Sequence, residues 1–228
     1  MTLSPNLERL DALIAAAIPV LEGRFARSLE YREPAPPISE VEAEGLFRAV
    51  DAGFFEVADD GLCIPRLMRP STGFSYPLLS PLDRQSSTMV LWREWLTHAS
   101  LPATLHLDLG HACHDIALDV DAFDALVFST ENQPLIAAEA KKTIRELEKT
   151  VNEIAGHVQQ PFRLRRSPRL TNSEQKSRSL LALRPLFLFV VAPERSAAFA
   201  VSYAPDPGSA TARIDPVPIE RLALRPTK

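Results

Sequence analysis

Two short and mainly apolar runs lie in the middle of the chain, Phe123–Phe128 (FDALVF) and Leu135–Lys142 (LIAAEAKK). Successive side chains of a strand point to opposite faces, so both runs read as β-strands. Glu139 and Lys141 fall on one face of the second run, and Asp124 stands among apolar residues in the first. Burying charged groups in a core costs several kcal/mol unless something binds them, so these positions indicate a chemical role.

The turn-rich linker Ser129–Pro134 (STENQP) joins the two runs and predicts a hairpin that brings Asp124 close to Glu139. Two carboxylates and a lysine at a sheet edge suit Mg²⁺, which takes oxygen ligands from one or two carboxylates and keeps room for water and phosphate. Lys141 would orient or deprotonate the attacking water and offset charge on the phosphate. Mn²⁺ would serve in place of Mg²⁺. The alternative is a surface strand end with a solvated Glu–Lys pair.

Further elements of an α/β fold are predicted after Lys142. A helix is expected there, because apolar residues recur at helical spacing. Its buried stripe consists of Ile144, Leu147, Val151, Ile154 and Val158. The continuous apolar run Pro185–Val191 reads as a central strand, with Ala197–Tyr203 as its partner and Thr211–Val217 as an edge strand.

The N-terminal part reads as two helices. Leu7–Leu21 has apolar residues at helical spacing, and Pro19 should kink the helix or end it near Ile18. Ser39 is a good N-cap for the second helix, and Glu42 three residues later completes a capping box.

A hairpin and a linker follow. Phe54–Val57 and Leu62–Arg66 flank Asp60-Gly61, which is a strong two-residue turn signal. Met68–Pro81 is rich in Pro, Ser and Gly, so we place a domain boundary near residue 80. Residues 1–80 then form a small helical and hairpin module, either similar to a winged helix or a helical lid on the domain that follows.

Between this linker and the first acidic strand, Asp83–Ser100 reads as a helix and Thr104–Asp119 as a strand with a turn near Gly110. The second segment contains zinc-ligand residue types, but their spacing matches no standard paired zinc motif. These residues are His106, His111, Cys113 and His114.

The pattern of Asp124, fourteen residues, and then Glu139-Ala140-Lys141 resembles the PD-(D/E)XK nuclease superfamily over roughly Asp83 to Tyr203. The resemblance implies a restriction-endonuclease-like core over residues 81–228, with a mixed sheet of four to six strands flanked by helices. It also implies phosphodiester hydrolysis with Mg²⁺. One departure is that Phe123, not proline, precedes Asp124.

The resemblance also suggests how the metal site is completed. Asp124 and Glu139 would hold the metal, and the carbonyl of Ala140 would add a ligand. Superfamily members often carry an acid on the helix before the first core strand, and Glu94 is the candidate here. Asp119 or Asp121 is an alternative ligand, because the strand register is uncertain by a residue or two. Some branches place a glutamine on the following helix, and the candidate is Gln159.

The net charge of −4 is unevenly distributed. Residues 1–100 carry 9 basic and 14 acidic side chains, residues 101–160 carry 4 and 10, and residues 161–228 carry 12 and 5, which gives −5, −6 and +7. A basic region on an acidic chain suits a polyanion or, as the alternative, an anionic partner protein. The residues expected to contact phosphates are Lys142, Arg145, Arg163, Arg165, Arg166, Arg169, Lys176 and Arg178.

We therefore expect a Mg²⁺-dependent endonuclease that acts on DNA, of restriction or host-defence type. Homodimerisation, or a protein bound to the N-terminal module, is also expected. Two cysteines give no disulfide framework, which fits the cytoplasm, and no apolar run reaches the length of a membrane span. The alternatives are an RNase and a non-catalytic nucleic-acid-binding or scaffold subunit that kept the fold.

Overall fold

The computed structural model describes residues 4–69, 75–83, 86–159, 170–204 and 211–224. The chain divides into two compact units, one of Met1–Leu67 with Gly73–Ala103 and one of Met68–Thr72 with Thr104–Lys228. We expected a boundary near residue 80, whereas residues 81–103 belong to the first compact unit.

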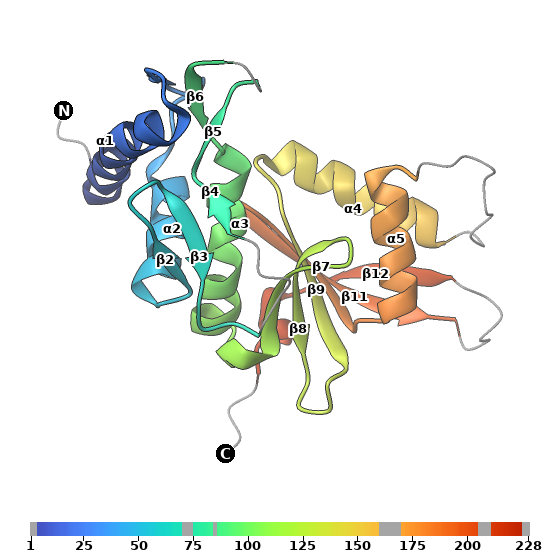
Figure 1. The fold of residues 1–228 in the computed structure, drawn as a ribbon. Coiled ribbons are helices and arrows are strands. Elements are labelled where there is room, and N and C mark those ends of the chain that lie inside the picture. Colours follow the sequence, from blue (N-terminus) through green and yellow to red (C-terminus); the bar gives the residue numbers. More distant parts are fainter. Residues whose placement is uncertain (1–3, 70–74, 84–85, 160–169, 205–210, 225–228) are drawn as a thin grey trace. The chain divides into compact units, whose positions relative to one another are not determined.

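The first unit contains three helices and two small sheets in its described part (Figure 1). The sheets have the strand orders β1-β6-β5 and β2-β3-β4. The elements are α1 (Pro5–Phe25), β1 (Glu30–Arg32), α2 (Glu40–Asp51), β2 (Phe55–Val57), β3 (Leu62–Pro65), β4 (Tyr76–Pro77), β5 (Leu79–Pro81), β6 (Thr88–Leu91) and α3 (Arg93–Ala103).

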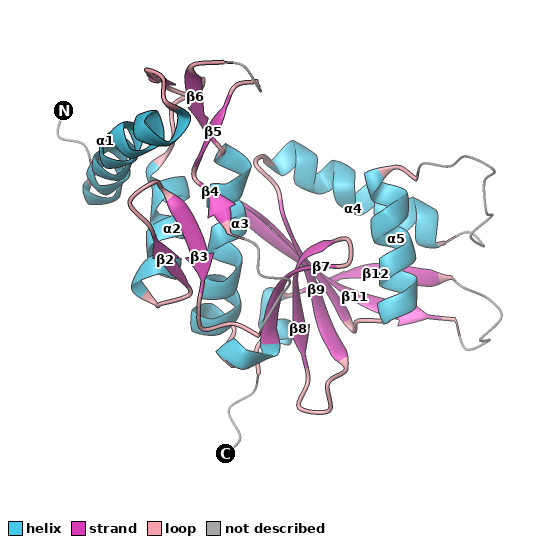
Figure 2. Ribbon diagram, in the orientation of Figure 1, coloured by secondary structure: helices cyan, strands magenta, loops and turns pink. Residues whose placement is uncertain are grey.

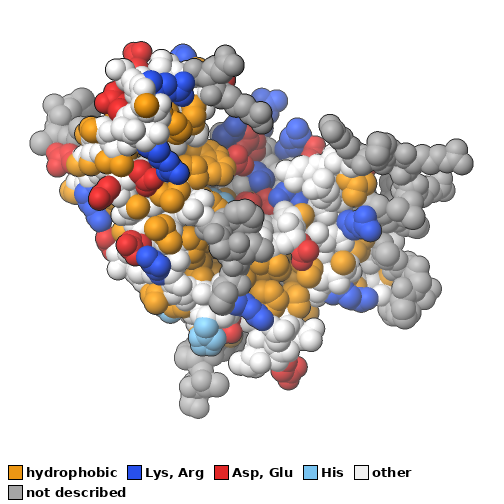
Figure 3. All heavy atoms as spheres, viewed as in Figure 1, with side chains coloured by type: hydrophobic (Ala, Val, Ile, Leu, Met, Phe, Trp, Pro, Cys, Tyr) orange, Lys and Arg blue, Asp and Glu red, His pale blue; other side chains and the backbone are white. Residues whose placement is uncertain are grey.

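Local signals of the first unit are largely confirmed. Ser39 caps α2 in a capping box: the Ser39 amide donates to the Glu42 carboxylate at 2.8 Å, and the Glu42 amide donates to Ser39 Oγ at 3.4 Å. Gly61 has a φ of +75°, as the turn between β2 and β3 requires. On the face shown in Figure 3, acidic and basic side chains of this unit are interspersed among apolar ones.

The structure differs from two predictions for the first unit. Helix α1 does not end near Ile18 but continues through Pro19 to Phe25, because Pro19 and Ala15 are both exposed and water can satisfy the Ala15 carbonyl that loses its helical donor. The expected helix over Asp83–Ser100 begins only at Arg93. Thr88–Leu91 instead forms β6, whose alternate residues are buried and whose backbone pairs with both β1 and β5.

The second unit is built on a six-stranded sheet with the order β12-β11-β10-β9-β8-β7 (Figure 2). Strands β9 and β10 are parallel and all other neighbours are antiparallel, which confirms the expected α/β class with a mixed sheet. The strands are β7 (Ile116–Val120), β8 (Phe123–Phe128), β9 (Pro134–Ala140), β10 (Phe187–Ala192), β11 (Arg195–Tyr203) and β12 (Ala212–Val217).

Helices α4 (Ile144–Val158) and α5 (Asn172–Leu183) pack against this sheet (Figure 1). The predicted stripe of α4 is buried except for Ile144, which is half-buried. It meets Leu180 of α5 and residues such as Leu126 and Leu188 of the sheet in one apolar cluster. This packing covers one face of the sheet that carries β8 and β9.

The prediction of a strand over Thr104–Asp119 is wrong except for its last residues. The segment forms a π-helical turn (Thr104–Asp108) and a 3₁₀ turn (Cys113–Asp115) before β7, and a later 3₁₀ turn covers Ile219–Leu222. The turn at Gly110 is present, with a φ of +78°. His106 Nδ1 lies 2.6 Å from the His111 carbonyl oxygen, so this imidazole fastens the turn to the backbone.

The stripe of α4 should contribute a large share of the second unit's stability. Ile154 is fully buried, so Ile154→Ala should lower the free energy of unfolding of this unit by about 2–4 kcal/mol. The measurement is hydrogen exchange of second-unit peptides, because both tryptophans belong to the first unit. Glu153→Ala is the matched control: Glu153 is exposed and pairs with Lys149 at 3.8 Å, so the loss should stay below about 0.5 kcal/mol. Equal losses in the two variants would contradict the assignment.

Candidate metal centre on strands β7, β8 and β9

Strand pairing brings two acids together at one end of the sheet. The register of β7 and β8 pairs Leu118 with Ala125, so Asp119 and Asp124 come opposite each other across the ladder. Asp119 has a left-handed backbone, with a φ of 48°. Both carboxylates are half-buried.

A third acid lies on the next strand. The register of β8 and β9 pairs Ala125 with Ala138, so continuing it sets Asp124 opposite Glu139. Asp124 Oδ2 accepts a hydrogen bond from the Ala140 amide at 2.7 Å. Asp124 thereby holds the end of β9 in place. The predicted hairpin and the proximity of its two acids are both present.

The Glu139 carboxylate is fully buried, and each of its oxygens bonds to a lysine. Lys141 Nζ donates to Glu139 Oε2 at 2.7 Å and to the carbonyl oxygen of Ala140 at 2.8 Å. Lys176 Nζ donates to Glu139 Oε1. Two ammonium groups therefore offset the charge of one buried carboxylate.

Lys176 occupies a different place from the one expected. As a phosphate contact it should be exposed, but its residue is only 5% exposed, and Nζ also donates to the Ala122 carbonyl oxygen at 2.7 Å. The signal that would have revealed this is its spacing on α5, because Lys176 and Leu180 are four residues apart and share the buried face.

The electrostatics of the cluster favour a cation. Burial and the neighbouring Asp124 raise the pKa of Glu139 against the opposing effect of Lys176 and Lys141. Burial, followed by repulsion from Asp124 and Glu139, raises the pKa of Asp119 to about 6. Three carboxylates and two ammonium groups give the cluster a net charge of −1 when all are ionised.

The cluster offers the type of donor atom that a hard divalent cation takes. Asp119, Asp124 and Glu139 carry carboxylate oxygens, which are the ligands that Mg²⁺ and Mn²⁺ prefer in proteins, and ligand atoms of Asp119 and Asp124 lie within 4.8 Å of each other. Repulsion between the carboxylates, which adds to the effect of burial on the two pKa values, is the kind that a bound cation relieves. The Ala140 carbonyl oxygen, which we expected to be a further metal ligand, accepts a hydrogen bond from Lys141 Nζ.

Several expected site residues are not part of this cluster. Glu94 is an exposed residue of α3 in the first unit, and Asp121 is exposed in the turn after β7. Gln159 is the exposed C-cap of α4. The residues Lys142, Arg145 and Arg178 are exposed on the second unit, and Lys142 pairs with Glu146 at 3.3 Å. Arg163, Arg165, Arg166 and Arg169 lie outside the described residues.

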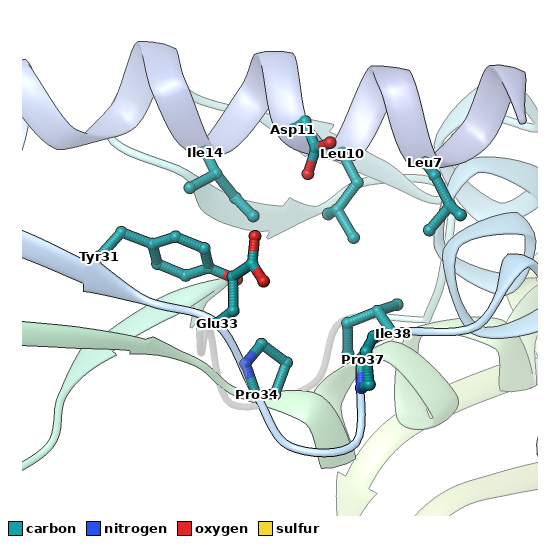
Figure 4. Close-up of a pocket in the computed structure, with 9 residues that line it drawn as sticks. All are labelled: Leu7, Leu10, Asp11, Ile14, Tyr31, Glu33, Pro34, Pro37 and Ile38. Atoms are coloured by element: carbon teal, nitrogen blue, oxygen red, sulfur yellow. The ribbon is translucent and has the colours of Figure 1, made fainter. Parts of the chain in front are cut away.

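A cavity of about 250 Å³ lies in the first unit, beneath α1 (Figure 4). Asp11 and Glu33 point into it among aliphatic and proline side chains. Burial, followed by Glu33 and Asp11, raises the pKa of Tyr31 in its wall to about 12. None of the carboxylates and lysines of the cluster on β7, β8 and β9 lines this cavity.

No family model, curated protein or solved structure matches the chain. Among the described residues, no helix is both long enough and apolar enough to cross a membrane.

The raised pKa of Asp119 makes a prediction about stability. The folded protein binds this proton more tightly than the unfolded chain does, so ionisation costs stability as the pH rises through about 6. Asp119→Asn removes the charge and keeps a residue type that tolerates a left-handed backbone. In EDTA at pH 7.5 it should raise the unfolding temperature by about 2–4 °C, or about 1 kcal/mol after discounting for partial exposure. At pH 4 the gain should be much smaller.

Differential scanning calorimetry at the two pH values checks this. Glu131→Gln, an exposed acid in the turn between β8 and β9, is the matched control and should change neither midpoint. If Asp119→Asn lowers the unfolding temperature at pH 7.5, the ionised Asp119 carboxylate is stabilised by its neighbours and the prediction is wrong.

Proposed function

We propose that this protein is a Mg²⁺-dependent nuclease of the PD-(D/E)XK type that hydrolyses phosphodiester bonds, and that it is a DNA endonuclease of restriction or host-defence type. The observation that carries the proposal is the position of Asp124, Glu139 and Lys141 in one cluster at the end of two adjacent strands. The order of strand, hairpin, strand and helix, with its sequence signature at the end of β9, supports the same reading. An electronegative cluster with both carboxylates and lysines supports metal-assisted hydrolysis.

The residues of this cluster would have different roles in the reaction. Asp124 and Glu139 would hold the divalent cation, with Asp119 as a third carboxylate beside them. The bound cation supplies charge that stabilises the phosphate and acidifies a water molecule. Lys141 Nζ, bonded to both Glu139 and the Ala140 carbonyl oxygen, stands where it can hold a water by hydrogen bonding and offset charge on the phosphate.

The expected partner is DNA, which the exposed Lys142, Arg145 and Arg178 would contact through phosphates. A homodimer, or a protein bound through the N-terminal module, remains part of the proposal, as does a cytoplasmic location. Cys63 and Cys113 are both free thiols, which agrees with a reducing compartment.

One observation favours a second candidate function. Both oxygens of Glu139 already bond to lysines, so the cluster could serve as an internal ion-pair network in a non-catalytic nucleic-acid-binding or scaffold subunit. Digestion of a supercoiled plasmid and of a structured RNA, each in Mg²⁺, Mn²⁺, Ca²⁺ and EDTA, separates this candidate and an RNase from the DNA endonuclease.

Asp124→Asn and Glu139→Gln should each lower the rate of plasmid nicking in Mg²⁺ by at least about a thousandfold, because each removes an anionic ligand and keeps the side-chain volume. Circular dichroism shows whether each variant is folded. Glu131→Gln, the exposed acid of the same hairpin, should cleave like the wild type. Wild-type cleavage by a folded Asp124→Asn or Glu139→Gln protein would remove that residue from the site.

Lys141→Ala should lower kcat by about a hundredfold or more and change DNA affinity less than about threefold, because its proposed action is in the transition state. Single-turnover cleavage gives the rate, and binding to a labelled duplex in Ca²⁺ gives the affinity. Lys149→Ala, an exposed lysine of α4, is the control. If affinity falls in proportion to rate, Lys141 is only a phosphate contact.

A further inference from the structure

Two neighbouring basic residues of α5 lie in opposite environments. Lys176 is 5% exposed and donates to Glu139 Oε1 and to the Ala122 carbonyl oxygen, whereas Arg178 is exposed. Lys176 therefore joins three separate segments: α5, the end of β9, and the turn between β7 and β8.

The same contacts argue against a phosphate contact at Lys176. Reaching a substrate phosphate would require its ammonium group to leave a fully buried carboxylate, and an uncompensated buried charge is strongly unfavourable. The Ala122 carbonyl oxygen lies between Asp119 and Asp124 in the sequence, so the ammonium group also fixes the turn that carries the other two acids.

We propose that Lys176 is a positioning residue of the metal centre: its ammonium group fixes the Glu139 carboxylate and competes with the divalent cation for it. The proposal rests on the function proposed above, because it needs a cation at this cluster. In this role Lys176 orients Glu139 and sets the charge of the cluster. The exposed Arg178 of the same helix would contact the nucleic acid.

Two opposing effects follow from removing this ammonium group. The net charge of the cluster changes from −1 to −2, so a cation binds more tightly. Glu139 also loses an anchor, and a lost partner behind a metal ligand typically costs 10–100-fold in affinity or activity. Because Lys176 and Glu139 are both buried, we expect repulsion between the ammonium group and a divalent cation to exceed that loss. Lys176→Met should therefore bind metal about tenfold more tightly or better, while kcat falls about 10–100-fold.

The experiment compares four proteins with the wild type. Lys176→Met removes the charge, and Lys176→Arg keeps it. Lys149→Met is the matched control on the exposed face of α4, and Arg178→Met tests an exposed basic residue on α5. Mn²⁺ binding is measured by isothermal titration calorimetry at pH 8 without nucleic acid, and binding to a labelled duplex in Ca²⁺ is measured across a salt series.

The expected result is tighter Mn²⁺ binding in Lys176→Met alone, with Lys176→Arg and Lys149→Met within about threefold of the wild type. The salt slope of duplex binding should be unchanged in Lys176→Met and about one unit smaller in Arg178→Met, because only Arg178 would neutralise a phosphate. A merely structural role for Lys176 would weaken metal binding and turnover together.

Three results would overturn this inference. A folded Lys176→Met protein could bind Mn²⁺ no more tightly than the wild type, or it could show a smaller salt slope of duplex binding. Lys176→Arg could bind Mn²⁺ more than about tenfold more tightly than the wild type. The Lys176→Arg result still decides if Lys176→Met does not fold. Failure of the proposed function looks different: a wild-type protein that binds Mn²⁺ but cleaves neither DNA nor RNA refutes the nuclease, while tighter binding in Lys176→Met would still support the role of Lys176.

Discussion

The Glu139 carboxylate lies out of contact with water at the end of β9, and its charge must be offset from within the protein. Lys141 and Lys176 do so from two directions, one from the position just after β9 and one from α5. An ion in a low-dielectric interior is tolerated only with close partners and satisfied hydrogen bonds. This requirement links β9, the β7–β8 turn and α5 around Glu139, while strand pairing sets Asp119 and Asp124 beside it.

Charge balance is the second property of this cluster that bears on the proposed cation. Burial, followed by repulsion from neighbouring carboxylates, raises the pKa values of Glu139 and Asp119. The cluster holds three carboxylates and only two ammonium groups. A wholly structural ion-pair network would gain by matching its charges, whereas a site that admits a cation gains by leaving an excess of negative charge. The excess is small, which fits a cation that binds reversibly.

The sequence predicted those features whose causes are local. The capping box at Ser39 and the apolar stripe of α4 each depend on residues a few positions apart, and both were correctly predicted. The helix expected over Asp83–Ser100 was wrong in its first half because β6 is decided by pairing with β1 and β5, which are remote or weakly patterned. For the candidate site, alternation along β9 indicated Glu139 and Lys141. The burial of Lys176 could be predicted from its spacing with Leu180 on α5, but its partner Glu139, 37 residues away, could not.

The most direct test of a metal centre on Asp124 and Glu139 is a crystal soaked in Mn²⁺ and measured near the manganese absorption edge. The proposed function predicts one anomalous peak bonded to carboxylate oxygens of both residues, at about 2.0–2.3 Å as expected for a small hard cation. An absent peak at saturating Mn²⁺, with Lys141 and Lys176 still bonded to Glu139, would contradict it and leave the cluster as an internal ion-pair network.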